Sequence, residues 1–156
     1  MKTATKGFKV KGFIACSDPC YGQPTVFVPA KKGNWVARAE TSNEGMWGVR
    51  VSKITVHHEE FSPLGNNYEI EEHVVGVDSG QAGVFDGSIY SGDNEGFYNC
   101  CCEATLAKPG YGYVDGGFVS SSGYGDGRFE CIVYKKDGKA IGVEITFIDE
   151  NEEEDE

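Results

Sequence analysis

The segment CIVYKKDGKAIGVEITFI, residues 131–148, is the part of the sequence that decides the fold class. Two runs rich in β-branched and aromatic residues flank the dipeptide Asp137-Gly138. Both central positions of a tight two-residue hairpin turn need a positive φ, and Asp-Gly is one of the pairs that favour such a turn. The segment therefore predicts an antiparallel hairpin of two strands, residues 131–136 and 139–148.

Working outward, most of the remaining chain shows the same period of two. The apolar face that begins at Trp47 resumes at Ile54 after a one-residue shift near Ser52-Lys53, which predicts a β-bulge. Further strands are expected over residues 8–14 and 114–121. The pattern predicts a mainly all-β fold, an antiparallel β-sandwich with long glycine-rich loops. Its core is expected to contain Trp35, Trp47, Val49, Val51, Val77, Phe85, Val133, Ile145 and Phe147.

One short α-helix is expected near Asn94–Leu106, with Asp93 as its capping residue. Phe97, Cys101 and Ala104 have the i, i+4, i+7 spacing of one helical face.

Composition and charge indicate one domain followed by an acidic tail. The chain has 156 residues and a formal net charge of −11, and its last eight residues hold seven of the 25 acidic residues. A block of like charges is typically disordered. We therefore expect a single β-sandwich domain over residues 1–148 and a disordered acidic tail over residues 149–156.

Composition and charge also limit the expected compartment and partners. The sequence has no run of 18 apolar residues and no segment resembling a signal peptide, so we expect a cytoplasmic protein without membrane contact. Its lysines are scattered or paired, as at Lys31-Lys32 and Lys135-Lys136, and form no extended basic stretch. Direct nucleic-acid binding is therefore not expected. The oligomeric state stays open.

Six cysteines lie at positions 16, 20, 100, 101, 102 and 131. In a chain without a signal peptide reduced thiols are the default, and we expect buried or half-buried free thiols without an obligatory disulfide. A zinc site, formed by the C-x3-C pair at Cys16 and Cys20 with the run Cys100-Cys101-Cys102, is the alternative.

Two short motifs carry a resemblance to a known family. Val77-Asp78-Ser79-Gly80 and the loop Ser120-Ser-Ser-Gly-Tyr-Gly-Asp-Gly127 resemble segments of the bacterial and phage family called "domain of unknown function 4241". The resemblance covers roughly residues 74–147. It implies a mainly β domain and no particular reaction.

The candidate site comes from the same two motifs. Asp78, Ser79, Tyr124 and Asp126 all lie where an apolar strand gives way to a glycine-rich turn, and loops at one end of a sandwich cluster together. Carboxylates and a tyrosine there could bind a ligand. The alternative is that Asp78 and Asp126 only hold the backbone of their own turns.

No catalytic residues and no cofactor are expected. His57 or His58 with His73 and a glutamate could form a two-histidine, one-carboxylate metal site, although a solvated strand end explains these residues equally well. The expected function is that of a small binding or interaction protein with a protein partner, such as a regulator or a phage-encoded host-interaction protein. The alternatives are a metal-dependent hydrolase that uses loop aspartates and an acidic nucleic-acid mimic.

Overall fold

The hairpin at the C-terminal end of the chain is the centre of a large sheet. In the computed structural model, which describes residues 7–62, 67–92 and 94–149, strand β10 (Gly127–Lys136) turns directly into β11 (Lys139–Thr146). Asp137 and Gly138 have φ values of 56° and 80°, and Lys136 is the partner of Lys139. The two-residue turn predicted from Asp137-Gly138 is confirmed.

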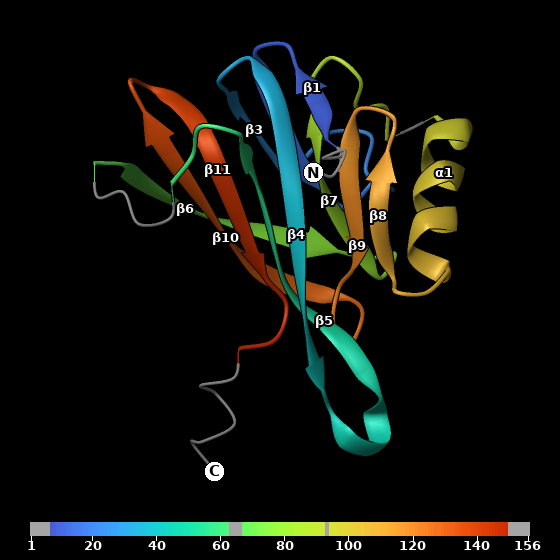
Figure 1. Ribbon diagram of the computed structural model, residues 1–156. Coiled ribbons are helices and arrows are strands. Elements are labelled where there is room, and N and C mark those ends of the chain that lie inside the picture. The colour runs from blue at the N-terminus through green and yellow to red at the C-terminus, as the bar shows by residue number, and fades with distance from the viewer. Residues whose placement is uncertain (1–6, 63–66, 93, 150–156) are drawn as a thin grey trace, which may run out of the picture.

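Two antiparallel sheets pack against each other, which confirms the all-β sandwich (Figure 1). The six-stranded sheet has the order β1 (Phe8–Val10), β4 (Gly33–Asn43), β5 (Val49–His58), β11, β10 and β6 (Glu69–Val77). The five-stranded sheet has the order β3 (Val26–Pro29), β2 (Phe13–Ser17), β7 (Gln81–Asp86), β9 (Gly117–Ser121) and β8 (Tyr111–Val114).

Two expected strands are divided in the structure. The strand expected over residues 8–14 is split, because β1 pairs with β4 in one sheet and β2 pairs with β7 in the other. The strand expected over residues 114–121 is a hairpin instead, since β8 and β9 pair with each other around Asp115-Gly116. In both cases the apolar alternation continues across a turn that changes the direction of the chain.

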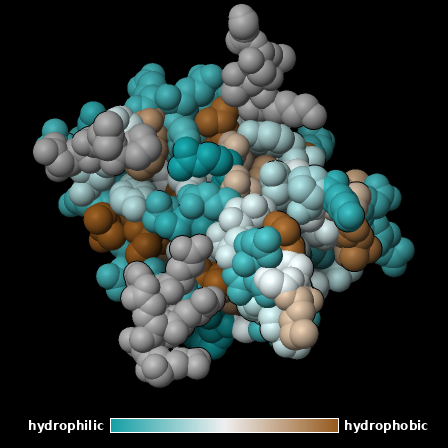
Figure 2. Space-filling model, turned by 60° about the horizontal axis from the view of Figure 1, so that its bottom comes forward, coloured by the Kyte–Doolittle hydropathy of each residue, from teal (hydrophilic) through white to brown (hydrophobic). Residues whose placement is uncertain are grey.

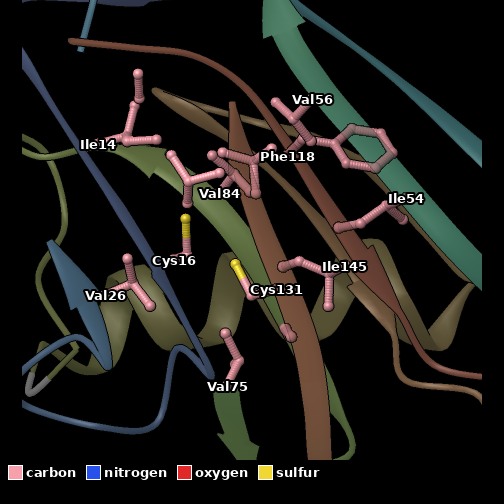
Figure 3. Packing of buried hydrophobic residues seen from close by; sticks show 14 of the residues in the cluster. Ile14, Cys16, Val26, Ile54, Val56, Val75, Val84, Phe118, Cys131 and Ile145 are labelled. Carbon is pink, nitrogen blue, oxygen red and sulfur yellow. The ribbon is translucent and has the colours of Figure 1, made fainter. Parts of the chain in front are cut away.

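The core lies between the two sheets and is formed by β-branched and aromatic side chains (Figure 3). Cys16 of β2 and Cys131 of β10 belong to this core, and each thiol is fully buried. Seven residues expected in the core are buried: Trp35, Val51, Val77, Phe85, Val133, Ile145 and Phe147. Trp47 and Val49, also expected there, are exposed.

Helix α1 (Glu95–Leu106) covers the outer face of the five-stranded sheet (Figure 1). Cys101 packs against Phe85 of β7 and Val119 of β9, with Phe97 and Ala104 beside it, as the spacing predicted. The capping residue is Asn94, whose side chain accepts a hydrogen bond from the Phe97 N–H at 3.0 Å. Asp93, expected as the cap, lies outside the described residues.

Strands β4 and β5 continue past the edge of the sandwich as a two-stranded ribbon (Figure 1). Glu40 pairs with Lys53 and Thr41 pairs with Val51, so Ser52 is the extra residue of the predicted bulge. Beyond Lys53 toward the ribbon tip, β5 has no pairing with β11. A short 3₁₀ helix, η1 (Gly45–Trp47), forms the tip.

Two further expectations concern the acidic C-terminal tail and contact with a membrane. Apart from Asp149, the acidic tail expected over residues 149–156 lies outside the described residues. In the described part of the chain, no helix has the length and apolar character needed to cross a membrane.

Candidate functional site: the motif turns and the β4–β5 hairpin

A buried carboxylate joins the end of β2 to the Asp78-Ser79-Gly80 turn. Asp18 directly follows β2 and is fully buried. Its Oδ2 accepts hydrogen bonds from the N–H groups of Asp78 and Ser79, both at 2.7 Å. Its Oδ1 accepts from the Cys20 N–H at 2.8 Å and from the Ser79 hydroxyl at 2.6 Å. Four donors therefore satisfy this carboxylate, and it serves as a structural anchor of the turn.

Two tyrosines complete this anchor. The Tyr21 hydroxyl donates to Asp78 Oδ2 at 2.7 Å, and this bond is the main reason why the pKa of Tyr21 rises to about 12. The Tyr90 hydroxyl lies within hydrogen-bond distance of the carbonyl oxygens of Asp18 and Tyr21. Burial raises the pKa of Tyr90 to about 12. The turn is thus held by two side chains of the segment after β2, and Tyr90 in turn holds the backbone of that segment.

A shallow pocket of about 310 Å³ lies beside this anchor, at the start of α1, and is lined by Cys20, Gly92, Asn94, Glu95 and Tyr98. Partial burial and the neighbouring Asp18 carboxylate raise the pKa of the Cys20 thiol to about 12. A thiol with that pKa is protonated at neutral pH and is a poor nucleophile. A hydrogen bond with Cys102 likewise raises the pKa of the Tyr98 hydroxyl. The pocket therefore contains no activated nucleophile among these groups.

The two sequence motifs adjoin each other at this end of the sheets. Gly127 is the ladder partner of Val77, and Asp126 and Asp78 are the chain neighbours of this last pair. The Ser122 N–H donates to the Gly80 carbonyl at 3.1 Å, which fixes the second loop against the first turn. The structure thus brings Asp78, Ser79 and the backbone of Asp126 together. The Asp126 residue is exposed.

Tyr124, the fourth predicted site residue, faces the β4–β5 hairpin instead. Its hydroxyl donates to Glu44 Oε1 at 2.6 Å, and the Arg50 guanidinium lies 4.8 Å from the centre of its ring. Arg50 also donates to the carbonyl oxygens of Trp47 at 3.0 Å and Gly123 at 3.2 Å. Hydrogen bonds from Ser42 and Tyr124 hold the pKa of the Glu44 carboxyl below its ordinary value. The glycine-rich loop and the hairpin tip therefore form one continuous surface.

We call this surface, formed by Met46, Trp47, Val49 and Tyr124, the hairpin surface. The exposed fractions of these residues are 90%, 62%, 68% and 53% in the same order. Figure 2 turns this end of the molecule forward and shows brown apolar patches scattered over a mainly hydrophilic surface. The expectation that Trp47 and Val49 are buried is wrong, because the ribbon extends beyond the strands that would cover it.

Sequence reasoning missed two parts of this site. The role of Asp18 depends on contacts with residues 60 and 61 positions away, which no local pattern reveals. The hairpin surface had a local signal, since Met46 and Trp47 are large apolar residues placed between Gly45 and Gly48 in a turn. Apolar residues at a turn tip indicate exposure, because turns lie at the surface.

The three histidines each have a hydrogen-bond partner within the protein. His57 Nδ1 lies 2.9 Å from the His58 carbonyl, His58 Nε2 lies 3.0 Å from the Lys32 carbonyl, and His73 Nε2 lies 3.2 Å from Glu71 Oε1. Among residues 7–62, 67–92 and 94–149, no three His, Cys, Asp or Glu side chains are grouped so as to hold a metal ion.

The cysteines are more varied than the expected set of buried or half-buried thiols. Cys16, Cys101 and Cys131 are buried and Cys102 is half-buried, but Cys20 and Cys100 are exposed. Hydrogen bonding to Cys131 and burial raise the pKa of Cys16 well above its ordinary value, so the Cys16 thiol packs as a neutral group.

Comparison with known proteins identified no relative of this chain. No family model, no curated protein and no solved structure matches the chain. The resemblance of residues 74–147 to "domain of unknown function 4241" therefore stays a prediction.

Proposed function

We propose that this chain is a protein-binding module and that the hairpin surface is its recognition site. The observation that carries the proposal is the exposure of Met46, Trp47 and Val49 on a projecting ribbon, together with the exposed Tyr124 of the adjoining loop, which bonds to Glu44 of the hairpin. Aromatic residues, methionine and arginine are enriched at the centres of protein interfaces, and single exposed apolar residues are not unusual. Three such residues on the hairpin and a fourth on the adjoining loop form a patch that a partner would cover.

The hairpin surface is also held in one arrangement before binding. Arg50 spans the tip by bonding to the carbonyls of Trp47 and Gly123, and Glu44 accepts the Tyr124 hydroxyl. A preorganised surface loses less side-chain entropy when it associates, which favours affinity. Glu44 and Arg50 place charge at the border of the apolar centre, the arrangement typical of interfaces. The partner expected here has an apolar pocket with a polar border.

The motif turns support the recognition site. The loop of Tyr124 is fixed to the Asp78-Ser79-Gly80 turn, and Asp18 fixes that turn to the end of β2. A binding module of this kind suits a regulator or a phage-encoded host-interaction protein. We place it in the cytoplasm, where thiols such as those of Cys16 and Cys131 stay reduced.

The test begins with capture of partners from a lysate of the source cells and purification of the recovered protein. Titration calorimetry then compares the wild-type chain with the double variant Met46→Ser/Trp47→Ser. A truncated interface tryptophan commonly costs at least about 2 kcal/mol, so we expect a weakening of about 30-fold or more. Because both side chains are exposed, the melting temperature of the variant should stay close to that of the wild type.

The matched control is Leu106→Ser, at the end of α1. Leu106 is 86% exposed and lies on a different element, so its replacement removes an exposed apolar residue without touching the hairpin surface. The control should bind the partner as the wild type does. Equal affinity of the double variant and the wild type would refute the proposed recognition site.

A further inference from the structure

Two lysine pairs that lie far apart in the sequence meet at one end of the sandwich. Lys31 and Lys32 lie between β3 and β4, whereas Lys136 and Lys139 flank the turn between β10 and β11. The Lys31 N–H donates to the Ala140 carbonyl at 2.9 Å, which joins the two segments through the backbone. The four ammonium-bearing side chains are therefore brought together by the fold.

A pocket of about 430 Å³ lies among these residues, and its walls are the four lysines together with Glu60, Tyr68, Asp137 and Ile141. Sites for small molecules in proteins commonly have volumes of about 300–1,000 Å³. Tyr68 and Ile141 supply apolar surface, while the lysines supply donors and positive charge. The pocket thus has the size and the mixed character of a small-ligand site.

The positive charge in this pocket is poorly balanced. Lys136 and Lys139 are direct cross-strand partners, and like charges in that position repel and destabilise a hairpin. Lys31 forms an ion pair with Glu60 at 3.6 Å. Within the described part of the chain, no carboxylate forms an ion pair with Lys32, Lys136 or Lys139. An anion between these three ammonium groups would remove the repulsion.

We propose that this pocket binds a phosphorylated small molecule carrying several negative charges. Lysine is a common ligand of phosphate groups, for which its ammonium acts as a point charge with three donors. Lys32, Lys136 and Lys139 hold the phosphate groups, and Tyr68 and Ile141 contact the organic part of the ligand.

The pocket between the lysine pairs, which we call the phosphate pocket, is a separate binding site from the hairpin surface. The two sites lie at opposite ends of β4, which begins at Gly33 beside the pocket and ends at Asn43 beside the hairpin tip (Figure 1). A strand of that length spans about 33 Å at the usual rise per residue. Loss of binding at one site therefore leaves the other site intact, and the two proposals can fail separately.

The test is titration calorimetry of the full chain with two probes, adenosine triphosphate and inorganic tripolyphosphate. Both should bind to the wild type, and adenosine triphosphate should bind more tightly because its organic part contacts Tyr68 and Ile141. The double variant Lys136→Gln/Lys139→Gln should weaken both probes about tenfold or more, since each loses two charge-assisted contacts. Without ligand its melting temperature should equal or exceed that of the wild type, because the cross-strand repulsion is gone.

The matched control, Lys53→Gln/Lys108→Gln, removes the same charge from positions outside the pocket. It should change the affinity for either probe less than about twofold at physiological salt, where distant charges are screened. Three results would overturn the proposal: no binding of either probe, equal weakening by the control, or tighter binding of a single-stranded oligonucleotide than of adenosine triphosphate.

Discussion

Replacement of Asp18 by asparagine is the substitution that tests the motif turns most sharply. The change keeps the shape of the side chain but removes its charge and converts one acceptor oxygen into a donor NH₂ group. In the structure Oδ2 faces the N–H groups of Asp78 and Ser79, and Oδ1 faces the Cys20 N–H and the Ser79 hydroxyl. Every partner of this buried carboxylate is thus a donor.

The loss in the free energy of unfolding caused by Asp18→Asn depends on which of its two orientations the asparagine side chain adopts, and the more favourable orientation sets its size. With its oxygen at the Oδ2 position, the amide keeps two backbone bonds, and the Ser79 hydroxyl can rotate to accept from the new NH₂ group. The Cys20 N–H is then left facing a donor. One charge-assisted hydrogen bond of roughly 1.5–3 kcal/mol is lost and the others become neutral, so we expect destabilisation by about 3 kcal/mol.

Urea unfolding followed by circular dichroism measures this loss as a shift of the midpoint. The matched control is Asp126→Asn, an exposed aspartate of the adjoining loop, which should change the free energy of unfolding by less than about 0.5 kcal/mol. A loss below about 1 kcal/mol for Asp18→Asn, or an equal loss for the control, would contradict the anchoring role of Asp18.

Three further predictions concern other parts of the molecule. The pKa of Tyr21 rises from 10.0 to about 12, so the contribution of Tyr21 to the free energy of unfolding should be constant below pH 10 and fall between pH 10 and 12; Tyr21→Phe should make the measured fall in urea titrations less steep over that range, and an unchanged pH profile would count against the bond to Asp78. Trp35→Ala should destabilise by about 3–5 kcal/mol, because Trp35 is fully buried, whereas Trp47→Ala should have little effect; similar losses in both would contradict the exposed ribbon. Reducing agents should leave the melting temperature unchanged, since no obligatory disulfide is expected, and a loss above about 2 kcal/mol on reduction would indicate a bridge.

Local patterns in the sequence predicted much of the sandwich. Asp137-Gly138 fixes its turn through backbone preferences of two adjacent residues, and the shift near Ser52-Lys53 marks the bulge directly. Both signals depend on neighbours in the chain. For the same reason, the helical face around Cys101 was predictable from spacing alone.

Other features depend on contacts that spacing does not contain. Alternation shows that Trp47 and Val49 share a face, but whether another strand covers that face depends on where β11 stops pairing with β5. The positions of the four predicted site residues also depend on long-range contacts. The pairing of β6 with β10 ends at Val77 and Gly127, the chain neighbours of Asp78 and Asp126, whereas Tyr124 contacts Arg50 and Glu44 of the hairpin.

The position of the lysine pairs likewise could not be predicted from spacing in the sequence. In the sequence Lys31-Lys32 and Lys135-Lys136 are separate pairs, and only the pairing of the segments at Ala140 brings Lys31 and Lys32 to the β10–β11 turn. Lys135 is not among the described residues that line the pocket, and it forms an ion pair with Glu71 at 2.9 Å.

Site-specific photocrosslinking is the most direct test of binding through the hairpin surface. A benzophenone amino acid replaces Met46 in one variant and Leu106 in another, both strongly exposed positions. Irradiation in a lysate of the source cells should join the Met46 variant to one discrete partner protein, and the Leu106 variant should give no such product. The same products from both positions, or none from Met46, would contradict the hairpin surface as the recognition site.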